Sequence, residues 1–425
     1  MKNVLAMILA GGRVGELSVL TLSRPKSAVP FGGMYRVIDF PLSNLMHSGV
    51  ENVGILSQYR SFSLINHLGV GAYWDFVGRD RGATMLLPST GQGMADWYKG
   101  TADAVYQNLE FIQDQHPETV MVLSGDHIYK MDYRSMLRYH QEKNADVTCA
   151  FIQIDPQECH RFGVATLDDE DGEVGGRIID YQEKPDSTDY SWASLTIYLF
   201  KPEVLYERLD ENAHHADSHE FGRDILSKIF ATHRVYGYKF SGYWGYTRTI
   251  DEYWQTNMEL LGDNPKIDLE KWQVRTNLDH DRLRDRPPAK VGSAAVIENS
   301  FIQNGCEIHG EVSNSILFPG VKIAEGAVVK NSILFFDTVV HAGSYLDKTI
   351  TDFDVQIGRE CYIGDGNASI PNNSYPNLLE TGINLIGKGT VLPPKIWMGR
   401  NCIVAPALKE EQFEQRKFES GVTVI

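Results

Sequence analysis

The N-terminal part of the chain alternates short apolar runs with longer stretches that have the pattern of a helix. Residues 4–9, 53–56 and 120–123 are continuous apolar runs of strand length. Residues 102–114 have the longer, mixed pattern of a helix. Such alternation is typical of a parallel sheet that is covered on both faces. We therefore predict an α/β, Rossmann-like domain with a mostly parallel sheet over residues 1–263.

A different texture follows in residues 264–288. This segment is dense in charged side chains and ends in Pro287-Pro288. Charged, proline-terminated stretches are typical of connections between domains. We interpret residues 264–288 as a linker.

From Ala289 onward the helical pattern is absent, and Val, Ile and Leu alternate with Gly, Asn and Asp. Apolar positions recur at a step of six residues. The clearest run is Ile386, Leu392, Met398 and Val404. A six-residue period is the signature of a left-handed parallel β-helix. We predict that fold for residues 289–425, with residues 367–381 as a loop that breaks the period. An irregular β domain is the alternative.

Charge and composition exclude several classes of function. The formal net charge of −16 repels nucleic acid and anionic membranes, so neither is an expected partner. A phosphate site must then be built locally, from backbone amides and a few Lys or Arg. The five cysteines form no CxxC pair, which fits a reducing cytoplasm. No apolar stretch approaches the roughly 18 residues of a membrane span, and we interpret the apolar N-terminus as a first strand rather than a leader.

Two polar motifs directly follow predicted strands. Gly11 and Gly12 end the first apolar run, and Ser124-Gly125-Asp126 ends the run at 120–123. Ligands of α/β folds collect at such strand ends, and glycines let backbone amides approach a phosphate. The first motif lacks Gly-Lys-Ser/Thr, so it is not a P-loop. By spacing alone the first motif is either a weak dinucleotide fingerprint or an ordinary tight turn. Asp126, at a strand end directly after a glycine, is more typical of a functional residue.

Longer motifs occur in a fixed order along the whole chain. They are residues 24–33, 36–44, 97–104, 124–129, 162–164, 183–185, 194–200, 220–222 and 242–244. In this order, and followed by the β-helix pattern, they resemble the ADP-glucose pyrophosphorylases (glucose-1-phosphate adenylyltransferases) of bacteria. The resemblance implies a cytoplasmic nucleotidyltransferase of α-glucan (glycogen or starch) synthesis that converts ATP and glucose 1-phosphate to ADP-glucose and pyrophosphate. It also implies Mg²⁺ held by one or two carboxylates, and a homo- or heterotetramer.

The resemblance assigns roles to single residues. Lys26 would steer the phosphates, Asp126 would hold the metal, and Arg36 would belong to an effector site. The residues implied to line the nucleotide pocket are Leu9, Ala10, Gly11, Gly12, Gln58, Gly100, Thr101 and Ala102. Those implied to bind the sugar phosphate are Tyr98, Gly163, Glu183, Lys184 and Ser194.

Several positions depart from the family pattern. The loop usually reads Gly-Gly-x-Gly-(Thr/Ser)-Arg-Leu, but here Val14 replaces a glycine and Glu16 replaces the catalytic arginine. In the block Trp-x-Asp-Val-Gly-Thr, Tyr246 replaces the second metal-binding aspartate and Arg248 a glycine. Tyrosine is a poor Mg²⁺ ligand because its ordinary pKa is about 10. Reversing a charge ~5 Å from a polyphosphate costs roughly 6 kcal/mol, on the order of 10⁴ in rate.

These departures predict a weakly active chain or a regulatory subunit that pairs with a catalytic paralogue. The alternatives are a fully active enzyme, in which Arg13 or Arg248 compensates, and a sugar nucleotidyltransferase that uses another nucleotide. A β-helix acyltransferase is disfavoured by the N-terminal domain. A smaller departure is Thr196, where glycine is usual. We interpret His214, His215 and His219 as a solvated loop rather than a metal site.

Overall fold

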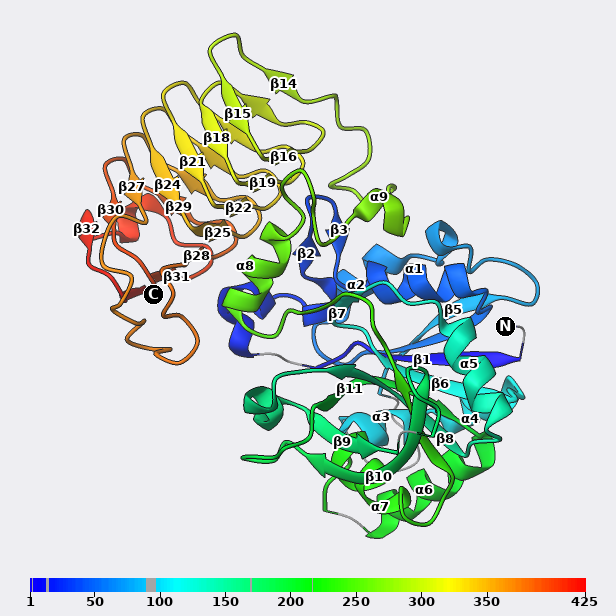
Figure 1. Ribbon diagram of the computed structural model, residues 1–425. Coiled ribbons are helices and arrows are strands. Elements are labelled where there is room, and N and C mark those ends of the chain that lie inside the picture. The colour runs from blue at the N-terminus through cyan, green and yellow to red at the C-terminus, as the bar shows by residue number, and fades with distance from the viewer. Residues whose placement is uncertain (2, 13–14, 89–96, 169, 216) are drawn as a thin grey trace. The chain divides into compact units, whose positions relative to one another are not determined.

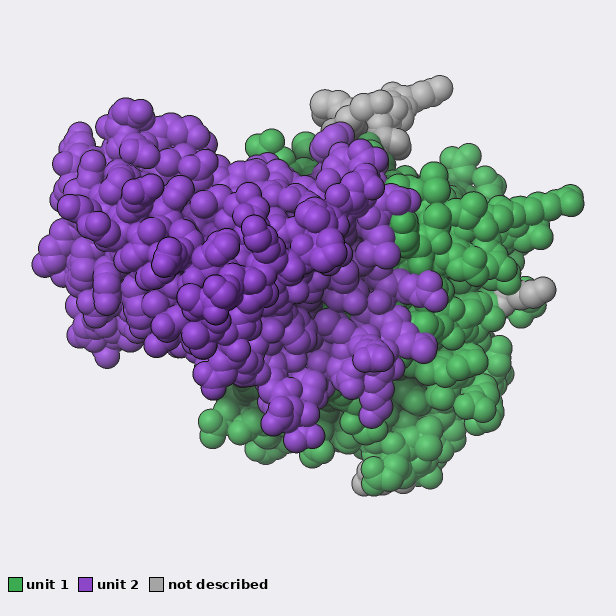
Figure 2. Space-filling view, turned by 90° about the horizontal axis from the view of Figure 1, so that it is seen from above, with its two compact units in different colours: residues 1–12, 40–61, 68–244 green, residues 13–39, 62–67, 245–425 purple. Residues whose placement is uncertain are grey.

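A computed structural model describes residues 1–425 except 2, 13–14, 89–96, 169 and 216. Two compact units, coloured separately in Figure 2, make up the chain. Unit 1 comprises residues 1–12, 40–61 and 68–244, and unit 2 comprises residues 13–39, 62–67 and 245–425. The chain first enters unit 2 directly after the predicted glycine turn, so each unit is built from segments that are distant in sequence.

Unit 1 is built on a nine-stranded sheet with the order β5-β4-β1-β6-β11-β8-β12-β10-β9 (Figure 1). Its strands are β1 (Val4–Leu9), β4 (Asn52–Leu56), β5 (Gly82–Leu86), β6 (Thr119–Ser124), β8 (Val147–Gln153), β9 (Gly163–Leu167), β10 (Gly175–Glu183), β11 (Trp192–Phe200) and β12 (Val235–Lys239). The apolar runs of the sequence form β1, β4 and β6, and these pair in parallel, as predicted. β11 runs antiparallel to both β6 and β8, so the other half of the sheet is mixed.

Several helices of unit 1 contribute apolar side chains to one core with this sheet. The helices are α1 (Asp39–Ser48), α3 (Thr101–Tyr106), α4 (Leu109–Asp114), α5 (Tyr133–Glu142), α6 (Pro202–His215) and α7 (Ser227–Ile229), with the 3₁₀ helices η3 (Ala72–Trp74) and η4 (Pro156–Arg161), the π-helix η5 (Phe221–Leu226) and the strand β7 (His127–Tyr129). The run at 102–114 forms two helices instead of one, because Asn108 leaves the helical conformation (φ −115°). Its side chain donates to the Ala104 carbonyl over 2.8 Å and closes the first helix.

The C-terminal part of unit 2 is a parallel β-helix of three sheets, drawn from yellow to red in Figure 1. The first sheet consists of β14 (Lys290–Val291), β17 (Glu307–Ile308), β20 (Lys322–Ile323), β23 (Val339–Val340), β26 (Gln356–Ile357) and β29 (Val391–Leu392). The second consists of β15 (Val296–Glu298), β18 (Glu311–Ser313), β21 (Val328–Lys330), β24 (Tyr345–Asp347), β27 (Tyr362–Ile363), β30 (Trp397–Met398) and β32 (Lys417–Phe418). The third consists of β16 (Phe301–Ile302), β19 (Ile316–Leu317), β22 (Ile333–Leu334), β25 (Thr349–Thr351), β28 (Asn384–Ile386), β31 (Ile403–Val404) and β33 (Thr423–Val424).

The six-residue step of the sequence marks the inside of this β-helix. The four positions of its clearest run are all fully buried in one apolar core, namely Ile386, Leu392, Met398 and Val404. Residues 367–381, all of them described, contain no helix or strand, as the break in the period predicted. The predicted fold class, a nucleotidyltransferase domain followed by a parallel β-helix, is confirmed.

The remainder of unit 2 consists of short elements. They are, wholly or in part, η1 (Gly15–Thr21), η2 (Lys26–Ala28), β2 (Pro30–Phe31), β3 (Tyr35–Arg36), α2 (Phe62–Leu68), β13 (Trp244–Tyr246), α8 (Ile250–Met258), α9 (Leu269–Trp272) and η6 (Glu410–Gln412). α8 begins with a capping box, in which Thr249 and Glu252 each bond the other's backbone amide. None of the described helices is long and apolar enough to cross a membrane.

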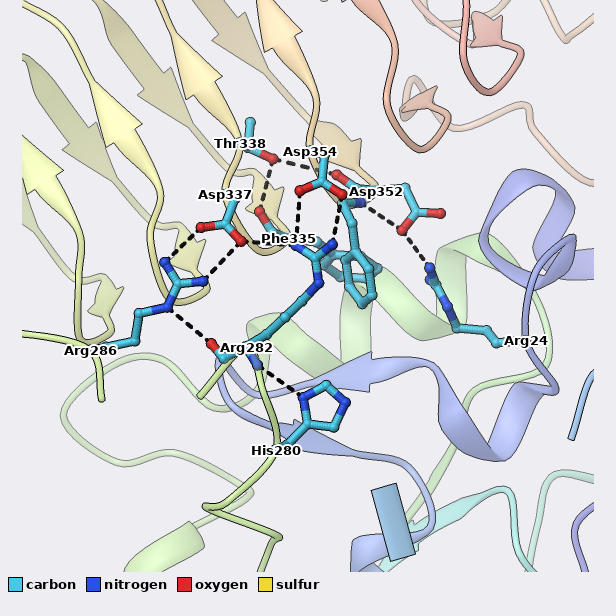
Figure 3. A network of polar contacts seen from close by, with 10 residues as sticks. Arg24, His280, Arg282, Arg286, Phe335, Asp337, Thr338, Asp352 and Asp354 are labelled. Carbon is cyan, nitrogen blue, oxygen red and sulfur yellow. Dashed lines mark hydrogen bonds and ion pairs between the residues drawn. The ribbon is translucent and has the colours of Figure 1, made fainter. Parts of the chain in front are cut away.

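Ion pairs fix several of these segments within unit 2 (Figure 3). The buried Arg24 donates to Asp352 over 2.8 Å, and both side chains are at most 2% exposed. Two arginines from the segment predicted as a linker, Arg282 and Arg286, both bond Asp337. Arg282 also bonds Asp354 over 2.7 Å. This part of residues 264–288 is therefore anchored to turns of the β-helix.

Candidate active site

The glycine turn of unit 1 lies at the carboxyl edge of its parallel strands. Directly after β1, the Ala10 amide donates to Leu56 over 2.9 Å. The Gly125 amide donates to the carbonyl of Leu9 over 2.9 Å. A Cβ atom at Gly11 would lie 2.6 Å from the Cα atom of Ser57, so only glycine fits there. At Gly12 a Cβ atom would meet nothing within 4 Å. The structure therefore brings the predicted residues Leu9 to Gly12 beside the strand end that carries Asp126.

The second group of predicted nucleotide residues surrounds the start of α3. Gln58 and Tyr98 are hydrogen-bonded, because the Tyr98 amide donates to the Gln58 side chain over 2.7 Å. The Thr101 hydroxyl donates to the Glu220 carboxylate over 2.6 Å, and the Ala102 amide donates to a neighbouring carbonyl over 2.8 Å. A side chain at Gly100 would collide with that same carbonyl group. Tyr98, which we assigned to the sugar phosphate, thus lies directly beside Gln58 of the nucleotide set.

Asp126 follows β6 and is held by its neighbours. The Ser124 hydroxyl donates to the Asp126 carboxylate, and the His127 Nε2 atom lies 3.4 Å from it. The Asp126 side chain remains 27% exposed. A partly exposed, oriented carboxylate fits Mg²⁺, which prefers one or two carboxylates together with phosphate oxygens and water. No cluster of three His, Cys, Asp or Glu side chains suited to a metal occurs among the described residues.

The predicted sugar-phosphate residues gather at the ends of β9 and β10. The Tyr181 hydroxyl donates to Glu183 over 2.7 Å. A Cβ atom at Gly163 would lie 2.7 Å from the Glu183 carboxylate, so glycine there leaves room for it. Lys184 has a left-handed backbone (φ 48°), and its Nζ atom lies 4.0 Å from Glu183. Burial raises the pKa of Tyr181, which keeps its hydroxyl a donor to Glu183.

Ser194 lies on β11, next to a bulge. Its hydroxyl lies 3.3 Å from the Tyr198 hydroxyl, and the strand register shifts between these two residues. Inside the bulge, Thr196 has a left-handed backbone with φ of 53°. The usual glycine of the family pattern adopts this conformation without strain.

Four side chains that we singled out in unit 2 form one polar cluster. The Arg248 Nε atom donates to the Glu16 carboxylate over 3.0 Å. The Arg248 Nη1 atom lies 3.5 Å from the Tyr246 hydroxyl. The Lys26 Nζ atom lies 5.3 Å from the centre of the Tyr246 ring. Glu16 and Arg248, which are 232 residues apart in sequence, therefore form an ion pair beside Tyr246.

Both Glu16 and Arg248 stay ionised within this cluster. Burial opposes ionisation of Glu16, but hydrogen bonds from its backbone and from Arg248, together with the charges of Arg248 and Lys26, lower its pKa below the ordinary value. Burial likewise opposes the charge on Arg248, but Tyr246 and Glu16 raise its pKa. Arg13 and Val14 lie outside the described residues.

The comparisons with known proteins cover both parts of the chain. Residues 5–262 match the family model described as nucleotidyl transferase, and residues 287–386 match that of the GlmU-like C-terminal hexapeptide. A glucose-1-phosphate adenylyltransferase of Thermotoga neapolitana is 43% identical over 100% of this chain and 99% of its own length. One of Thermosipho africanus is 45% identical over 95% of this chain and 96% of its own length.

This chain belongs to the glucose-1-phosphate adenylyltransferase family. Of the positions that the sequence analysis expects to depart from the family pattern, Thr196 lies in unit 1, and Glu16, Tyr246 and Arg248 lie in unit 2. Sequence reasoning noted Arg248 only as a possible compensation and missed its partner, because no periodic pattern links residues 16 and 248.

Arg36, implied in an effector site of this adenylyltransferase family, is buried in unit 2. Its guanidinium donates to the Ala28 carbonyl over 3.0 Å and to the Ser63 hydroxyl over 2.9 Å. It also lies 3.0 Å from His280 Nε2. Burial lowers the pKa of Arg36 to about 9, and burial beside Arg36 lowers the pKa of His280 to about 4. His280 is therefore neutral at pH 7 and accepts the hydrogen bond.

Among the described residues, the histidines of the 214–219 segment belong to no group of three His, Cys, Asp or Glu side chains that could hold a metal. His214 is exposed at the end of α6 and bonds the Asp210 carbonyl over 2.8 Å, as a solvated side chain does. His219 is buried and bonds the Asn212 side chain over 2.9 Å, so our interpretation of it as solvated was wrong. The side chain of His215 lies outside the described part of the structure.

Proposed function

We propose that this chain is a weakly catalytic glucose-1-phosphate adenylyltransferase that acts mainly as the regulatory subunit of a tetramer with a catalytic paralogue. It binds ATP and glucose 1-phosphate, and it forms ADP-glucose and pyrophosphate slowly. Family membership supports the substrates, and the unit 1 residues that keep their identities support binding. The Glu16 and Tyr246 substitutions support the low rate.

The reaction needs positioning and neutralisation of charge rather than a covalent intermediate. A phosphate oxygen of glucose 1-phosphate forms a bond to the α-phosphorus of ATP, and the bond between the α- and β-phosphates breaks. The amides of the glycine turn and of the start of α3 are proposed to hold the nucleotide. Lys184 is proposed to bind the sugar phosphate, while Glu183 accepts hydrogen bonds from sugar hydroxyls.

Asp126 is the carboxylate that fits Mg²⁺. When bound, the metal would supply positive charge to the phosphates, and Ser124 would keep the Asp126 carboxylate oriented. The Tyr246 position does not fit a second metal contact, because its neighbours are Lys26 and Arg248. A phenol flanked by two cations is an unfavourable place for a dication.

The observation that carries the proposed low rate is the Glu16–Arg248 ion pair. A carboxylate stands at the position of an arginine, and the nearby guanidinium is bonded to it. Catalysis of phosphoryl transfer depends on cations aimed at the developing charge. We expect a reduction on the order of 10⁴ in rate from these changes.

The test is an assay of ADP-glucose by the purified chain with ATP, glucose 1-phosphate and Mg²⁺. We expect turnover far below the median enzyme rate of about 10 s⁻¹. Asp126→Asn is the control that shows whether any residual activity belongs to this site. Turnover near 10 s⁻¹ that Asp126→Asn abolishes would contradict the proposal. Co-purification with a catalytic paralogue, and a rise in the paralogue's activity on mixing, test the regulatory part.

A second candidate function is a fully active adenylyltransferase. Arg248 favours it, since one arginine and one lysine still face one acid in the unit 2 cluster. The assay above separates the two candidates. Shifts in melting temperature with ATP, UTP and GTP identify the nucleotide, because a ligand that binds the folded state stabilises it.

A further inference from the structure

The unit 2 cluster contains as many acidic and basic side chains as the family pattern, but at different positions. By the family pattern stated above for the sequence, positions 16, 26 and 246 usually hold an arginine, a lysine and an aspartate. In this chain, Arg248 and Lys26 stand against Glu16, and the former aspartate position holds Tyr246. The numbers of acids and bases are equal in the two patterns. Their positions in the sequence differ, because the acid stands at position 16 instead of 246 and the arginine at position 248 instead of 16.

The new placement favours anions at Tyr246. The Lys26 Nζ atom lies 5.3 Å from the ring of Tyr246, and the Arg248 Nη1 atom lies 3.5 Å from its hydroxyl. Two like charges at such distances repel a dication by several kcal/mol at an effective dielectric constant of about 20. The same charges attract a phosphate. Arginine matches phosphate geometry with two parallel N–H donors.

The guanidinium group of Arg248, which a phosphate would use, is already bonded to Glu16. Both the Nε and the Nη2 atoms of Arg248 lie 3.0 Å from the same Glu16 oxygen. The pair is partly exposed, at 42% for Arg248 and 29% for Glu16, so a ligand in solution can reach it. A phosphate carries more negative charge than a carboxylate and bonds arginine more strongly. A phosphate can therefore replace Glu16 as the partner of Arg248.

We propose that Arg248 binds a polyphosphate directly and without Mg²⁺, that the charge of the buried Lys26 adds attraction, and that Glu16 is an internal competitor which the polyphosphate displaces. The ligand class is a pyrophosphate group, either free or as part of a nucleoside triphosphate. The inference rests on the proposed function for its choice of ligand, but its test needs no turnover. Glu16 is thus a positioning residue that sets the affinity of Arg248 for phosphate.

The test is calorimetric titration of the full chain with inorganic pyrophosphate, once with Mg²⁺ and once with EDTA. We expect binding in EDTA. Arg248→Ala should weaken this binding about 10- to 100-fold, because one charge-assisted pair is lost. The affinity of Arg248→Lys for pyrophosphate should lie between those of the unchanged chain and Arg248→Ala. Glu16→Gln should tighten it about 3- to 10-fold, since the competing charge is gone while the side chain keeps its size.

Two further arms complete the test. Lys322→Ala breaks an exposed ion pair with Glu307 on the β-helix, and this control should leave the affinity for pyrophosphate unchanged. ATP and glucose 1-phosphate titrated in EDTA distinguish a polyphosphate site from a monophosphate site. Melting temperatures of all variants show that they are folded.

Binding of pyrophosphate only when Mg²⁺ is present, or no tightening in Glu16→Gln, would overturn the inference. Stronger binding of glucose 1-phosphate than of pyrophosphate in EDTA would also overturn it. None of these outcomes changes the measured rate of ADP-glucose formation, so the failure of this inference and the failure of the proposed function are distinguishable.

Discussion

Residues that we assigned to one reaction occur in both units. The two units differ in whether these residues have the types that we expect from the family resemblance. In unit 1, Asp126 and Glu183 have the residue types that we expect from the resemblance, and neighbouring hydroxyls hold them in place. In unit 2, Glu16 and Tyr246 stand where we expect an arginine and an aspartate from the same resemblance. The local structure beside them is regular, since the capping box of α8 begins one residue after Arg248. Under the proposed function, the charges at positions 16 and 246 differ from the expected ones while α8 keeps a regular start.

Restoring the charges of unit 2 should have the largest effect. The triple variant Glu16→Arg, Tyr246→Asp and Arg248→Gly restores the expected family residues at these three positions, and we expect ADP-glucose formation to rise on the order of 10⁴-fold. Removing Arg248 is necessary, because Glu16→Arg alone would place two guanidinium groups side by side. Steady-state kinetics check this expectation, and Glu16→Arg alone is the matched control. A triple variant that folds and gains no activity would show that the substitutions are not the cause.

Breaking the scaffold of unit 2 should have the next largest effect. Asp352→Ala leaves the buried Arg24 without its carboxylate, which costs about 3–5 kcal/mol of stability. Thermal unfolding measures the loss. The matched control is Glu307→Ala, which breaks the exposed pair with Lys322 and should cost far less stability. Equal losses in the two variants would contradict the role of the buried pair.

A buried histidine in unit 1 and a partly buried one in unit 2 make stability depend on pH. Burial lowers the pKa of His140 in unit 1 and of His280 in unit 2 from 6.5 to about 4. Because the unfolded chain binds these protons first, stability falls as the pH drops from about 6.5 towards about 4. We expect His140 to contribute up to about 2 kcal/mol of loss between pH 7 and pH 5.

The variant His140→Gln checks the size of that contribution. Glutamine keeps a hydrogen-bonding partner for Thr148, which lies 2.8 Å from the His140 ring, and it carries no titrating group. Melting temperatures from pH 7 to pH 5 should therefore fall less in the variant than in the unchanged chain. An identical pH profile would rule out His140 as a source of the acid sensitivity.

The smallest expected effect concerns a departure within unit 1. Thr196→Gly removes a β-branched side chain from a left-handed conformation (φ 53°). We expect a gain of about 1 kcal/mol, since relief of strain exceeds the entropic cost of glycine. Thr84→Gly, in the regular part of β5, is the control and should destabilise the chain by a similar amount. A loss in Thr196→Gly would mean that the threonine contacts outweigh the strain.

Much of the fold was predictable because periodic patterns are local. The six-residue step identified the buried positions of the β-helix, and the apolar runs identified β1, β4 and β6. Gly11 was predictable as a turn, although the reason it must be glycine is its approach to Ser57. The break of one predicted helix at Asn108 depends on a single side-chain hydrogen bond, for which the sequence gives no periodic signal.

The candidate site was predictable only residue by residue. Resemblance assigned roles to Glu16 and Tyr246, but an ion pair between residues 16 and 248 depends on how distant segments meet within unit 2. The same holds for Tyr181, which shares one face of β10 with Glu183 and bonds it. Its position two residues away was a usable signal that we missed.

The central claim is that the chemical step itself is slow in this chain. The most direct test is a single-turnover measurement of ADP-glucose formation, with the chain in excess over ATP and with saturating glucose 1-phosphate and Mg²⁺, because it excludes product release. The account predicts a rate on the order of 10⁴ below that of the triple variant. Equal rates for the unchanged chain and the triple variant, both near 10 s⁻¹, would contradict it.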